Sequence, residues 1–294
     1  MSTVRRVLEG LDEITGWQEE LYVHLHANPE LSMQETETAA EVTKRLDELG
    51  YETQQIGGGV VGVLANGDGP TVLFRADMDA LPVKELTDLP YASTKTATDA
   101  DGNQVPVMHA CGHDMHVVAG LGAASLLAEQ RDAWSGTYVA LFQPGEETAA
   151  GARSMVDDGL TTKIPKPDVA LGQHVLTVPA AGEVGTTAGP ILSTGASVRV
   201  KVYGKGSHGS MPHLGVDPVV LSSAIVTRLQ TIVARELSPS EFGVVTVGSL
   251  QSGTKANIIP ADATMLVNVR AYDTAVREKI IAAIERIVVA ECDA

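Results

Sequence analysis

Segments with strand-like and helix-like patterns alternate across the first half of the chain, and this alternation constrains the fold more than any other feature. We expect helices at 4–27, 34–49, 114–130 and 151–159, and strands at 60–65, 71–75, 136–142 and 168–174. Alternating strands and helices are typical of an α/β domain whose mostly parallel sheet is covered by helices on both faces. In such sheets the functional loops lie at the carboxyl ends of the strands.

A different pattern follows Gly189-Pro190. We expect strands at 196–203, 243–251 and 262–271, and helices at 216–236 and 273–291. This β-α-β-β-α order is one strand short of the six-element ferredoxin-like unit. We therefore predict two domains, 1–189 and 190–294. Because a closing strand and a cap for the last helix are missing, we expect the chain to be a fragment of a longer protein, with a naturally short variant as the alternative.

Charge and hydropathy limit the partners that the chain can have. Its 294 residues include 37 acidic and 21 basic side chains, a formal net charge of −16, so we expect no binding to nucleic acid or to an anionic membrane. No apolar run approaches the ~20 residues of a membrane span, and the N-terminus lacks the apolar stretch of a signal peptide. Two cysteines, Cys111 and Cys292, cannot form a disulfide framework, which predicts a reducing, cytoplasmic compartment.

The strongest chemical signal is the segment 109–116, which holds three histidines, a cysteine and an aspartate. Cys111 and His113 are two residues apart, and Gly112 between them permits a bend that lets both side chains face one cation. A thiolate and an imidazole together suit a borderline metal such as zinc. The alternative is a helix start in which these side chains are merely packed. The other two histidines of the segment are expected behind the ligands or on the helix surface.

Two adjacent glutamates, Glu146 and Glu147, follow directly after the expected strand at 136–142. Neighbouring carboxylates in a loop can take different tasks, because one can ligate a metal while the other stays free as a general base. Taken alone, the pair would be better explained as a solvated turn in an acidic chain. The pair gains weight from its place at a strand end.

A further candidate ligand and two more acidic residues stand at the ends of two other expected strands. His174 closes the strand at 168–174. Asp77 and Asp79 follow the strand at 71–75. Because the carboxyl ends of parallel strands share one edge, we expect these side chains to lie near one another. So many carboxylates in one cleft are unfavourable without a cation, which favours a metal site over an empty acidic pocket.

Motifs in both halves of the chain resemble the M20 family of metallopeptidases. They are RADMDALP (75–82), MHACGHDMH (108–116), QPGEE (143–147), GQH (172–174) and GKGSHGSMPHLGVDP (204–218), with the segments 257–260 and 268–270. The ordered set spans nearly the whole chain and is most similar to the N-acyl-amino-acid amidohydrolases, the branch of the hippurate hydrolases and plant auxin-conjugate hydrolases. The resemblance implies a zinc-peptidase-like catalytic domain at 1–189 with an inserted ferredoxin-like α+β lid and dimerisation domain at 190–294, truncated in this chain.

The resemblance also implies a site for two divalent metal ions, zinc or manganese, with cobalt or nickel as alternatives. The positions that match the family's metal ligands are Cys111, His113, Glu147 and His174. Glu146 matches the general base, and Asp77 matches an acidic residue beside the metals. Arg75 stands where other branches place a histidine ligand. The family's further C-terminal histidine ligand has no counterpart, since no histidine follows His213.

Three residues of the second domain match positions that contact the substrate in the family. His208 matches a lid histidine that reaches the active site of a partner subunit and stabilises the oxyanion, which implies a homodimer. Asn257 and Arg270 match substrate-binding positions. An exposed strand edge at 243–251 or 262–271 is a second reason to expect a homodimer. Without the resemblance, His208 is also consistent with a turn-stabilising histidine and Arg270 with a structural ion pair.

The combined features predict a metal-dependent amidohydrolase that cleaves the amide bond of a small N-acyl amino acid or a related conjugate. A pair of metal ions can activate water and polarise the amide carbonyl, and an unligated Glu146 can accept the proton of that water. A dipeptidase or an N-acetyl-diaminopimelate deacetylase could use the same residues. A non-catalytic metal-binding fragment would also account for the ligand pattern. A hydrolase with Cys111 as nucleophile beside His113 would leave the paired glutamates unexplained.

Overall fold

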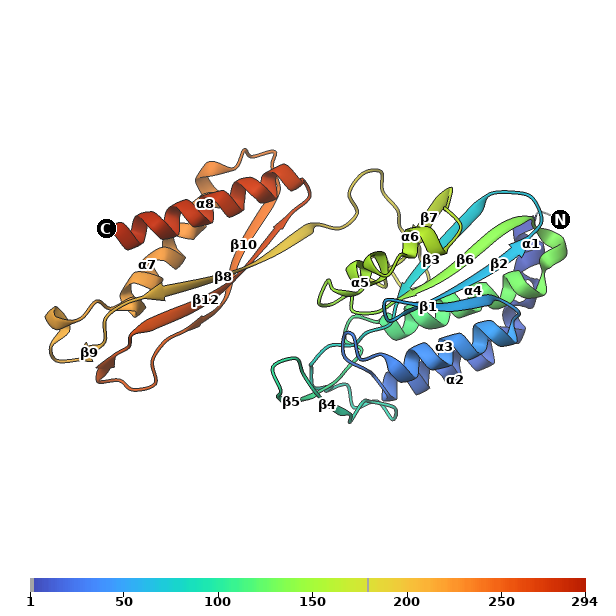
Figure 1. Ribbon diagram of the computed structural model, residues 1–294, viewed down its shortest axis with the longest axis horizontal. Helices are drawn as coiled ribbons and strands as arrows, with labels where there is room; N and C mark the ends of the chain where they lie inside the picture. The colour runs from blue at the N-terminus through green and yellow to red at the C-terminus, as the bar shows by residue number, and fades with distance from the viewer. Residues whose placement is uncertain (1–2, 179) are drawn as a thin grey trace. The chain divides into compact units, whose positions relative to one another are not determined.

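The computed structural model describes residues 3–178 and 180–294, and the chain divides into two compact units, residues 1–181 and 182–294 (Figure 1). The predicted domain boundary after residue 189 lies eight residues beyond this division. Each unit has its own sheet and its own hydrophobic core. Among the helices described, none combines the length and the apolar composition that a membrane span needs.

The first unit contains most of the segments predicted from the alternating pattern. Its helices are α1 (Thr3–Val7), α2 (Leu11–Ala27), α3 (Thr36–Glu48), α4 (His113–Glu129), α5 (Gly151–Asp157) and α6 (Leu160–Lys163), with 3₁₀ turns at Leu8–Gly10 and Arg131–Ala133. Its strands are β1 (Glu52–Ile56), β2 (Gly59–Asn66), β3 (Thr71–Asp77), β4 (Thr96–Thr98), β5 (Gln104–Pro106), β6 (Gly136–Gln143) and β7 (Val169–Gly172). The predicted helix at 4–27 is interrupted near Gly10, where a missing side chain weakens helical structure.

The main sheet has the strand order β1-β2-β6-β3-β7 and is mixed (Figure 1). β1 and β2 form a hairpin, and β2 is antiparallel to β6, whereas β3 is parallel to both β6 and β7. The α/β class is therefore confirmed, and four of the five strands run in one direction, with β2 as the antiparallel exception. The two-residue connection Gly57-Gly58, with positive φ at both residues, forces β1 and β2 to run in opposite directions.

The parallel strands β3, β6 and β7 end at one edge of this sheet. Asp77 at the end of β3 is opposite Gln143 at the end of β6, and Arg75 is opposite Gly172 at the end of β7. The loops that follow these strands therefore begin side by side, as expected for the carboxyl edge of an α/β sheet.

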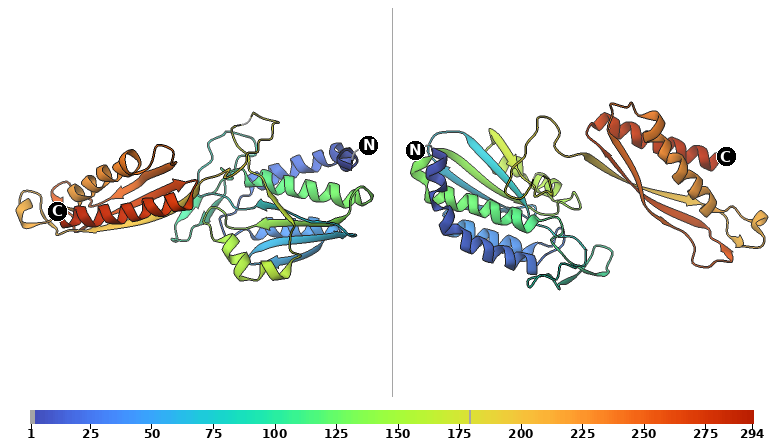
Figure 2. Two further views of the ribbon diagram at one scale, coloured as in Figure 1. Left: turned by 90° about the horizontal axis from the view of Figure 1, so that it is seen from above. Right: turned by 180° about the vertical axis from the view of Figure 1, so that it is seen from behind.

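Helices cover both faces of the main sheet because its central strands are apolar on both sides (Figure 2). Val60 and Leu64 of β2 pack into a core with α2, α3 and α4, while Val61 packs into a second core with α5 and α6. The same alternation in β6 directs Phe142 to the first core and Leu141 to the second. Each fully buried side chain of this kind stabilises the fold by about 1.5–3 kcal/mol.

The second unit follows the predicted β-α-β-β-α order in its main elements. It consists of β8 (Thr194–Tyr203), β9 (Ser207–His208), α7 (Pro218–Thr231), β10 (Gly243–Gln251), β11 (Ile258–Ile259), β12 (Asp262–Ala271) and α8 (Thr274–Asp293), with a 3₁₀ turn at Pro212–Leu214 and a π-helical turn at Ile232–Glu236. α7 begins at Pro218 because the side chain of Asp217 accepts hydrogen bonds from the first free N–H groups of the helix. The predicted helix at 216–236 ends as the π-helical turn.

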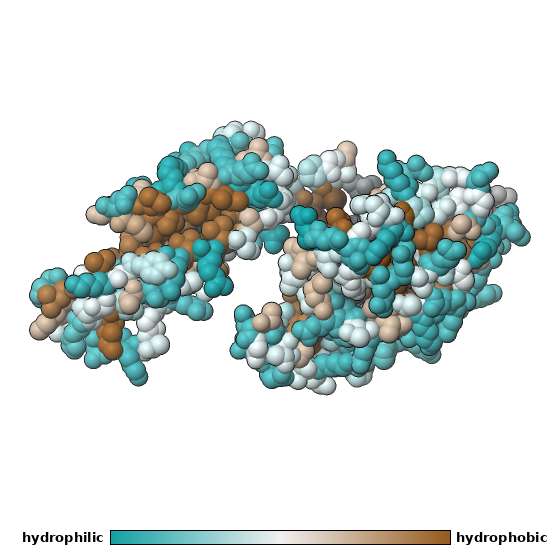
Figure 3. Space-filling view, in the orientation of Figure 1, coloured by the Kyte–Doolittle hydropathy of each residue, from teal (hydrophilic) through white to brown (hydrophobic). Residues whose placement is uncertain are grey.

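The sheet of the second unit is apolar on one face only. Its strands have the antiparallel order β10-β12-β8, and Met265 and Val267 of β12 are buried in a core with α7 and α8. Leu266 points to the opposite face and is 44% exposed. A broad hydrophobic area is visible elsewhere on the surface of this unit (Figure 3). Because β12 pairs on both sides, the expectation of an exposed edge at 262–271 is wrong, and 243–251 forms the edge strand β10.

Candidate metal centre

Side chains of the types that ligate metals converge at the carboxyl edge of the main sheet, from the start of α4, the end of β3 and the loops after β6 and β7. Three groups of donor atoms each lie within 4.8 Å of one another, and all three share His113. The groups are Cys111, His113 and His174; His113, Glu146 and Glu147; and Asp77, His113 and His116. The four predicted ligands are therefore brought together around His113.

Gly112 gives the first group its shape. Its φ is +79°, in the left-handed region, and it forms the N-cap of α4 between Cys111 and His113. A β-carbon at this position would overlap a methyl carbon of Val175, in the loop that carries His174. The glycine thus permits both the bend at the helix start and the close approach of the loop after β7.

His113 is fully buried and presents an unpartnered nitrogen to the cluster. Its Nδ1 donates to the backbone oxygen of Asp79 at 2.9 Å and lies 3.1 Å from Oδ1 of the same residue. Nε2 then has no hydrogen-bond partner among the described residues. Burial opposes protonation of His113, but the hydrogen bond to Asp79 and the charge of Asp77 outweigh burial and raise its pKa. An oxygen behind one ring nitrogen and an open second nitrogen is typical of histidines that ligate metals.

Glu147 and Cys111 are half-buried donors that resist ionisation. Glu147 Oε1 lies 3.8 Å from Nε2 of His113 and is another buried atom without a partner in the described part of the chain. Burial raises the pKa of Glu147, and burial together with the charge of Glu147 raises the pKa of Cys111 to about 12. A cation stabilises the ionised forms of such groups. The open nitrogen, the open oxygen and the thiol therefore fit a divalent metal ion such as zinc.

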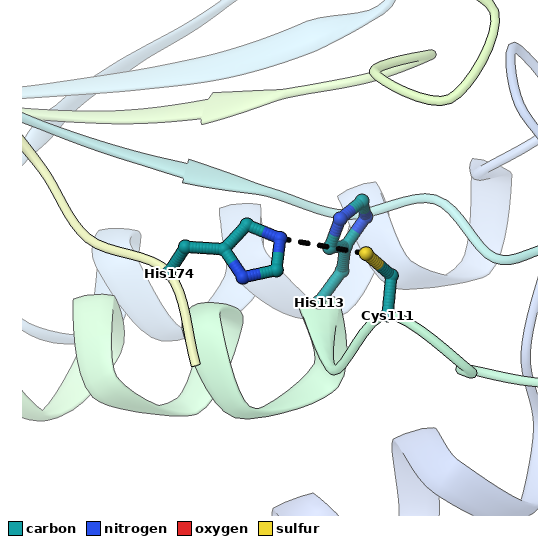
Figure 4. Close-up of side chains that lie close together, drawn as sticks. All are labelled: Cys111, His113 and His174. Carbon is teal, nitrogen blue, oxygen red and sulfur yellow. Dashed lines mark hydrogen bonds between the residues drawn. The ribbon is translucent and has the colours of Figure 1, made fainter. Parts of the chain in front are cut away.

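His174 completes the cluster from the loop after β7 (Figure 4). Its Nδ1 donates to the backbone oxygen of Val175 at 2.7 Å, and its Nε2 lies 3.4 Å from Sγ of Cys111. The side chains of Cys111, His113 and His174 point toward one another in the close-up view. The lone histidine at a strand end thus faces the same point as the cysteine and the histidine of the helix start.

His116 is buried rather than on the helix surface. Its Nδ1 donates to Oδ1 of Asp77, and its Nε2 accepts from the backbone N–H of Val175 at 2.9 Å. Both ring nitrogens of His116 therefore have hydrogen-bond partners, and the bond to Val175 joins α4 to the backbone next to His174. The position expected for it behind the ligands agrees with this geometry.

Asp77 is held by protein partners on both carboxylate oxygens. Nη1 of Arg75 donates to Oδ2 at 2.6 Å, and His116 donates to Oδ1. Burial would raise the pKa of Asp77, but the hydrogen bond from His116 and the charge of Arg75 lower it to about 2. Asp77 therefore stays ionised, and its Oδ2 lies 3.6 Å from Nε2 of His113.

Two contacts of the site were not predicted from the sequence. Oδ2 of Asp79 accepts from the hydroxyl of Ser32 at 2.6 Å and from the backbone N–H of Glu147 at 2.9 Å. Asp79 thus links the loop after β3 to the loop after β6 while it orients His113. The signal in the sequence was its place two residues after Asp77, on the same side of an extended chain.

The predicted substrate contacts of the second unit lie in two separate places, beside the small β9-β11 sheet and in strand β12. His208 in β9 is opposite Ile258 in β11, and the backbone oxygen of Asn257 accepts from Gly209 at 2.8 Å. Arg270 is at the other end of β12, opposite Gly195, where it donates to Oδ1 of Asn268 at 3.0 Å. The eight residue steps from Asp262 to Arg270 span about 26 Å of extended strand. Within one copy, His208 and Asn257 are neighbours and Arg270 is remote.

Residues 73–290 match the family described as peptidase family M20/M25/M40. The N-acetyl-L-cysteine deacetylase of Bacillus subtilis (strain 168) is 39% identical over 87% of this chain and 60% of that protein. The hippurate hydrolase of Campylobacter jejuni is 39% identical over 90% of this chain and 67% of that protein. The chain thus spans 60–67% of the length of these two relatives.

Comparison with a solved structure also indicates this family. The YXEP protein of Bacillus subtilis, described as a dinuclear metal binding peptidase from the M20 family, has a TM-score of 0.72 and 30% sequence identity, and the match covers 96% of this chain and 71% of that chain. The resemblance to the hippurate hydrolase branch is confirmed by the relatives of that kind. Motifs, fold and relatives agree, and the chain belongs to peptidase family M20/M25/M40.

Proposed function

We propose that this chain forms the metal-binding part of an amidohydrolase that releases an amino acid from a small N-acyl amino acid or a related conjugate. One observation carries the proposal: the donor atoms of Cys111, His113, Glu147 and His174 gather at one sheet edge, with the carboxylate of Glu146 beside them. The similar proteins named as an N-acetyl-L-cysteine deacetylase and a hippurate hydrolase support this substrate class.

Two divalent ions, zinc or manganese, are the proposed cofactors, with cobalt or nickel as alternatives. Two ions are supported by two donor groups that share His113, one that contains Cys111 and His174 and another that contains Glu147. The similarity to a dinuclear metal binding peptidase supports the same number. Such ions, when bound, lower the pKa of water and polarise an amide carbonyl.

Glu146 is the proposed general base. Its side chain is 40% exposed, compared with 19% for Glu147, and its Oε2 lies 3.9 Å from Nε2 of His113. The enclosed Glu147 is suited to hold a metal, while Glu146 at the rim can accept a proton from water and pass it to the leaving amine. Asp77 acts beside this pair by fixing His116 and, through it, the backbone that carries His174.

A homodimer is proposed to complete the substrate site. His208 would donate to the oxyanion and Arg270 would bind the substrate carboxylate, with Asn257 as a further contact. Within one copy Arg270 is separated from the other two by the length of β12, so all three cannot contact one small substrate. The separation supports a site to which two copies contribute.

A reducing, cytoplasmic compartment is proposed for the protein. Cys111 and Cys292 are both free thiols. Cys111 must remain reduced to act as a metal ligand, and the cytoplasm keeps thiols reduced.

Replacing Glu146 with Gln tests the assignment of the base. We expect kcat for N-acetyl and N-benzoyl amino acids to fall about 10²- to 10⁴-fold, because the amide cannot accept the proton. Metal content, measured by elemental analysis, should stay unchanged in Glu146→Gln and fall in the matched variant Glu147→Gln. Loss of metal from Glu146→Gln would show that the two glutamates have exchanged roles. A metal-loaded wild-type chain that hydrolyses none of these amides would contradict the proposed function and favour a metal-binding protein.

A further inference from the structure

Glu35 is a buried carboxylate outside the metal cluster, in the segment between α2 and α3. Its Oε1 accepts a hydrogen bond from the backbone N–H of Gly145 at 2.7 Å, across 110 residues of sequence. The backbone N–H groups of Met33 and of Glu35 itself also face the carboxylate. A buried carboxylate with N–H donors around it fixes the position of those donors.

The loop that Glu35 contacts has an unusual backbone. Gly145 has a φ of +52° and Ala149 a φ of +56°, and the facing Met33 has a φ of +64°. A β-carbon on Gly145 would lie 2.6 Å from the sulfur of Met33. Non-glycine residues with positive φ persist only where the surrounding structure holds them, and such positions concentrate at functional sites.

A second carboxylate holds the other side of the same loop. Asp79 accepts from the backbone N–H of Glu147. The peptides before and after Glu146 are thus each hydrogen-bonded to a buried acid, at Gly145 by Glu35 and at Glu147 by Asp79. The side chain of Glu146 itself extends to the rim with 40% exposure.

We propose that Glu35 is a positioning residue that fixes Gly145 and thereby sets the direction in which Glu146 leaves the loop. The inference rests on the proposed function, because it concerns the alignment of the proposed base. Glu35 lies outside the cluster of donor atoms, so its effect on turnover acts through the backbone of the loop. Misplacement of a catalytic group by about 1 Å can reduce the rate about 100-fold.

The test compares Glu35→Gln with a matched variant of the same segment, Glu30→Gln. The carboxylate of Glu30 accepts from the backbone N–H groups of Glu37 and Thr38 at the start of α3 and has no part in the loop after β6. With the zinc-loaded chain and N-acetyl amino acids, we expect Glu35→Gln to lower kcat about 10- to 100-fold, with KM and metal content unchanged within about twofold. Glu30→Gln should lower thermal stability and leave kcat unchanged.

A second readout does not depend on hydrolysis. In hydrogen–deuterium exchange, peptides from 143–151 should exchange faster in Glu35→Gln than in the wild-type chain, and at the wild-type rate in Glu30→Gln. Glu35→Asp, which keeps the charge on a shorter side chain, should lie between wild type and Glu35→Gln in both measurements, and replaces Glu35→Gln if the latter does not fold.

The outcomes separate the two proposals. A wild-type chain without activity but with faster exchange in Glu35→Gln contradicts the proposed function and leaves the positioning contact in place. An active wild-type chain whose kcat and exchange are the same in Glu35→Gln and Glu30→Gln overturns the role of Glu35.

Discussion

The two units of the molecule differ sharply in charge. Residues 1–181 hold 27 acidic and 11 basic side chains, whereas residues 182–294 hold ten of each, so the entire net charge of −16 belongs to the first unit. Among the described residues, every buried ionisable side chain also lies in the first unit, and the one buried polar residue of the second unit is Ser222. The excess of acidic residues and the buried ionisable side chains therefore occur in the unit that contains the candidate metal site.

The two units therefore differ in what their interiors contain. The second unit buries aliphatic side chains between one sheet face and two helices, and a broad hydrophobic area is visible on its surface (Figure 3). The first unit buries carboxylates and imidazoles together, which is unfavourable unless each is paired or bound to a cation. The comparison indicates that burial of the metal-ligating side chain types lowers the stability of the first unit while it fixes their positions.

The largest expected effect comes from breaking a buried ion pair of the first unit. His26 lies 2.7 Å from Asp114 and 3.1 Å from Glu85, and all three side chains are buried. We expect His26→Ala to destabilise the first unit by about 3–5 kcal/mol at pH 6, because two buried carboxylates lose their partner. Native-state hydrogen exchange of amides in α4, with α8 as the reference for the second unit, measures the change. His213→Ala, at an exposed histidine of the second unit, is the matched control.

The same pair predicts a pH dependence. Burial opposes protonation of His26, but its hydrogen bonds to Glu85 and Asp114 outweigh burial and raise its pKa. The stabilisation is complete below the ordinary pKa of about 6.5 and is lost as the pH rises through the higher pKa of the folded state. The difference between wild type and His26→Ala should therefore be smaller at pH 9 than at pH 6. Equal differences at both pH values would show that His26 is neutral in the fold.

A smaller effect is expected from the two cysteines, one in each unit. Cys111→Ser should weaken zinc binding at least about 100-fold, roughly 2.7 kcal/mol, because it replaces the sulfur donor. Cys292→Ser, at an exposed residue of α8, should bind zinc as the wild type does. Competition titration with a chromophoric chelator measures both affinities. Equal affinities in the two variants would remove Cys111 from the ligand set.

The smallest effect is expected from salt. Raising the ionic strength from about 0.01 to 0.15 M shortens the Debye length from about 30 to 8 Å and screens repulsion among the excess carboxylates of the first unit. With a chelator present, the free energy of unfolding of the first unit should rise by about 0.5–1 kcal/mol, and that of the second unit should not change. Hydrogen exchange of amides in α4 and α8 measures the free energy of unfolding of the first and the second unit, respectively. A parallel rise in both units would show that charge does not distinguish them.

Local patterns in the sequence were sufficient to predict the strands and loops that carry the candidate metal ligands. The strand at 71–75, the glutamates after 136–142 and His174 were predicted at one edge, and the register of β3, β6 and β7 aligns their ends. The prediction worked because parallel strands share an edge whatever their exact pairing. The assigned roles of the site residues stay predictions until the variants are measured.

Contacts between distant segments could not be predicted in this way. Glu35 meets Gly145 across 110 residues and His26 meets Asp114 across 88, and no local periodicity marks either pair. The antiparallel pairing of β2 with β6 was missed for the same reason, since strand order depends on the packing of the whole sheet. The remoteness of Arg270 from His208 also required the register of β12.

The raised pKa of Cys111 has a practical consequence for chemical labelling. A thiol that stays protonated reacts slowly with maleimides and iodoacetamide, because the thiolate is the reactive form. Cys292 in α8 is exposed to such reagents, while Cys111 is half-buried beside carboxylates. A fluorophore or a surface tether can therefore be attached at Cys292 near neutral pH with both native cysteines in place.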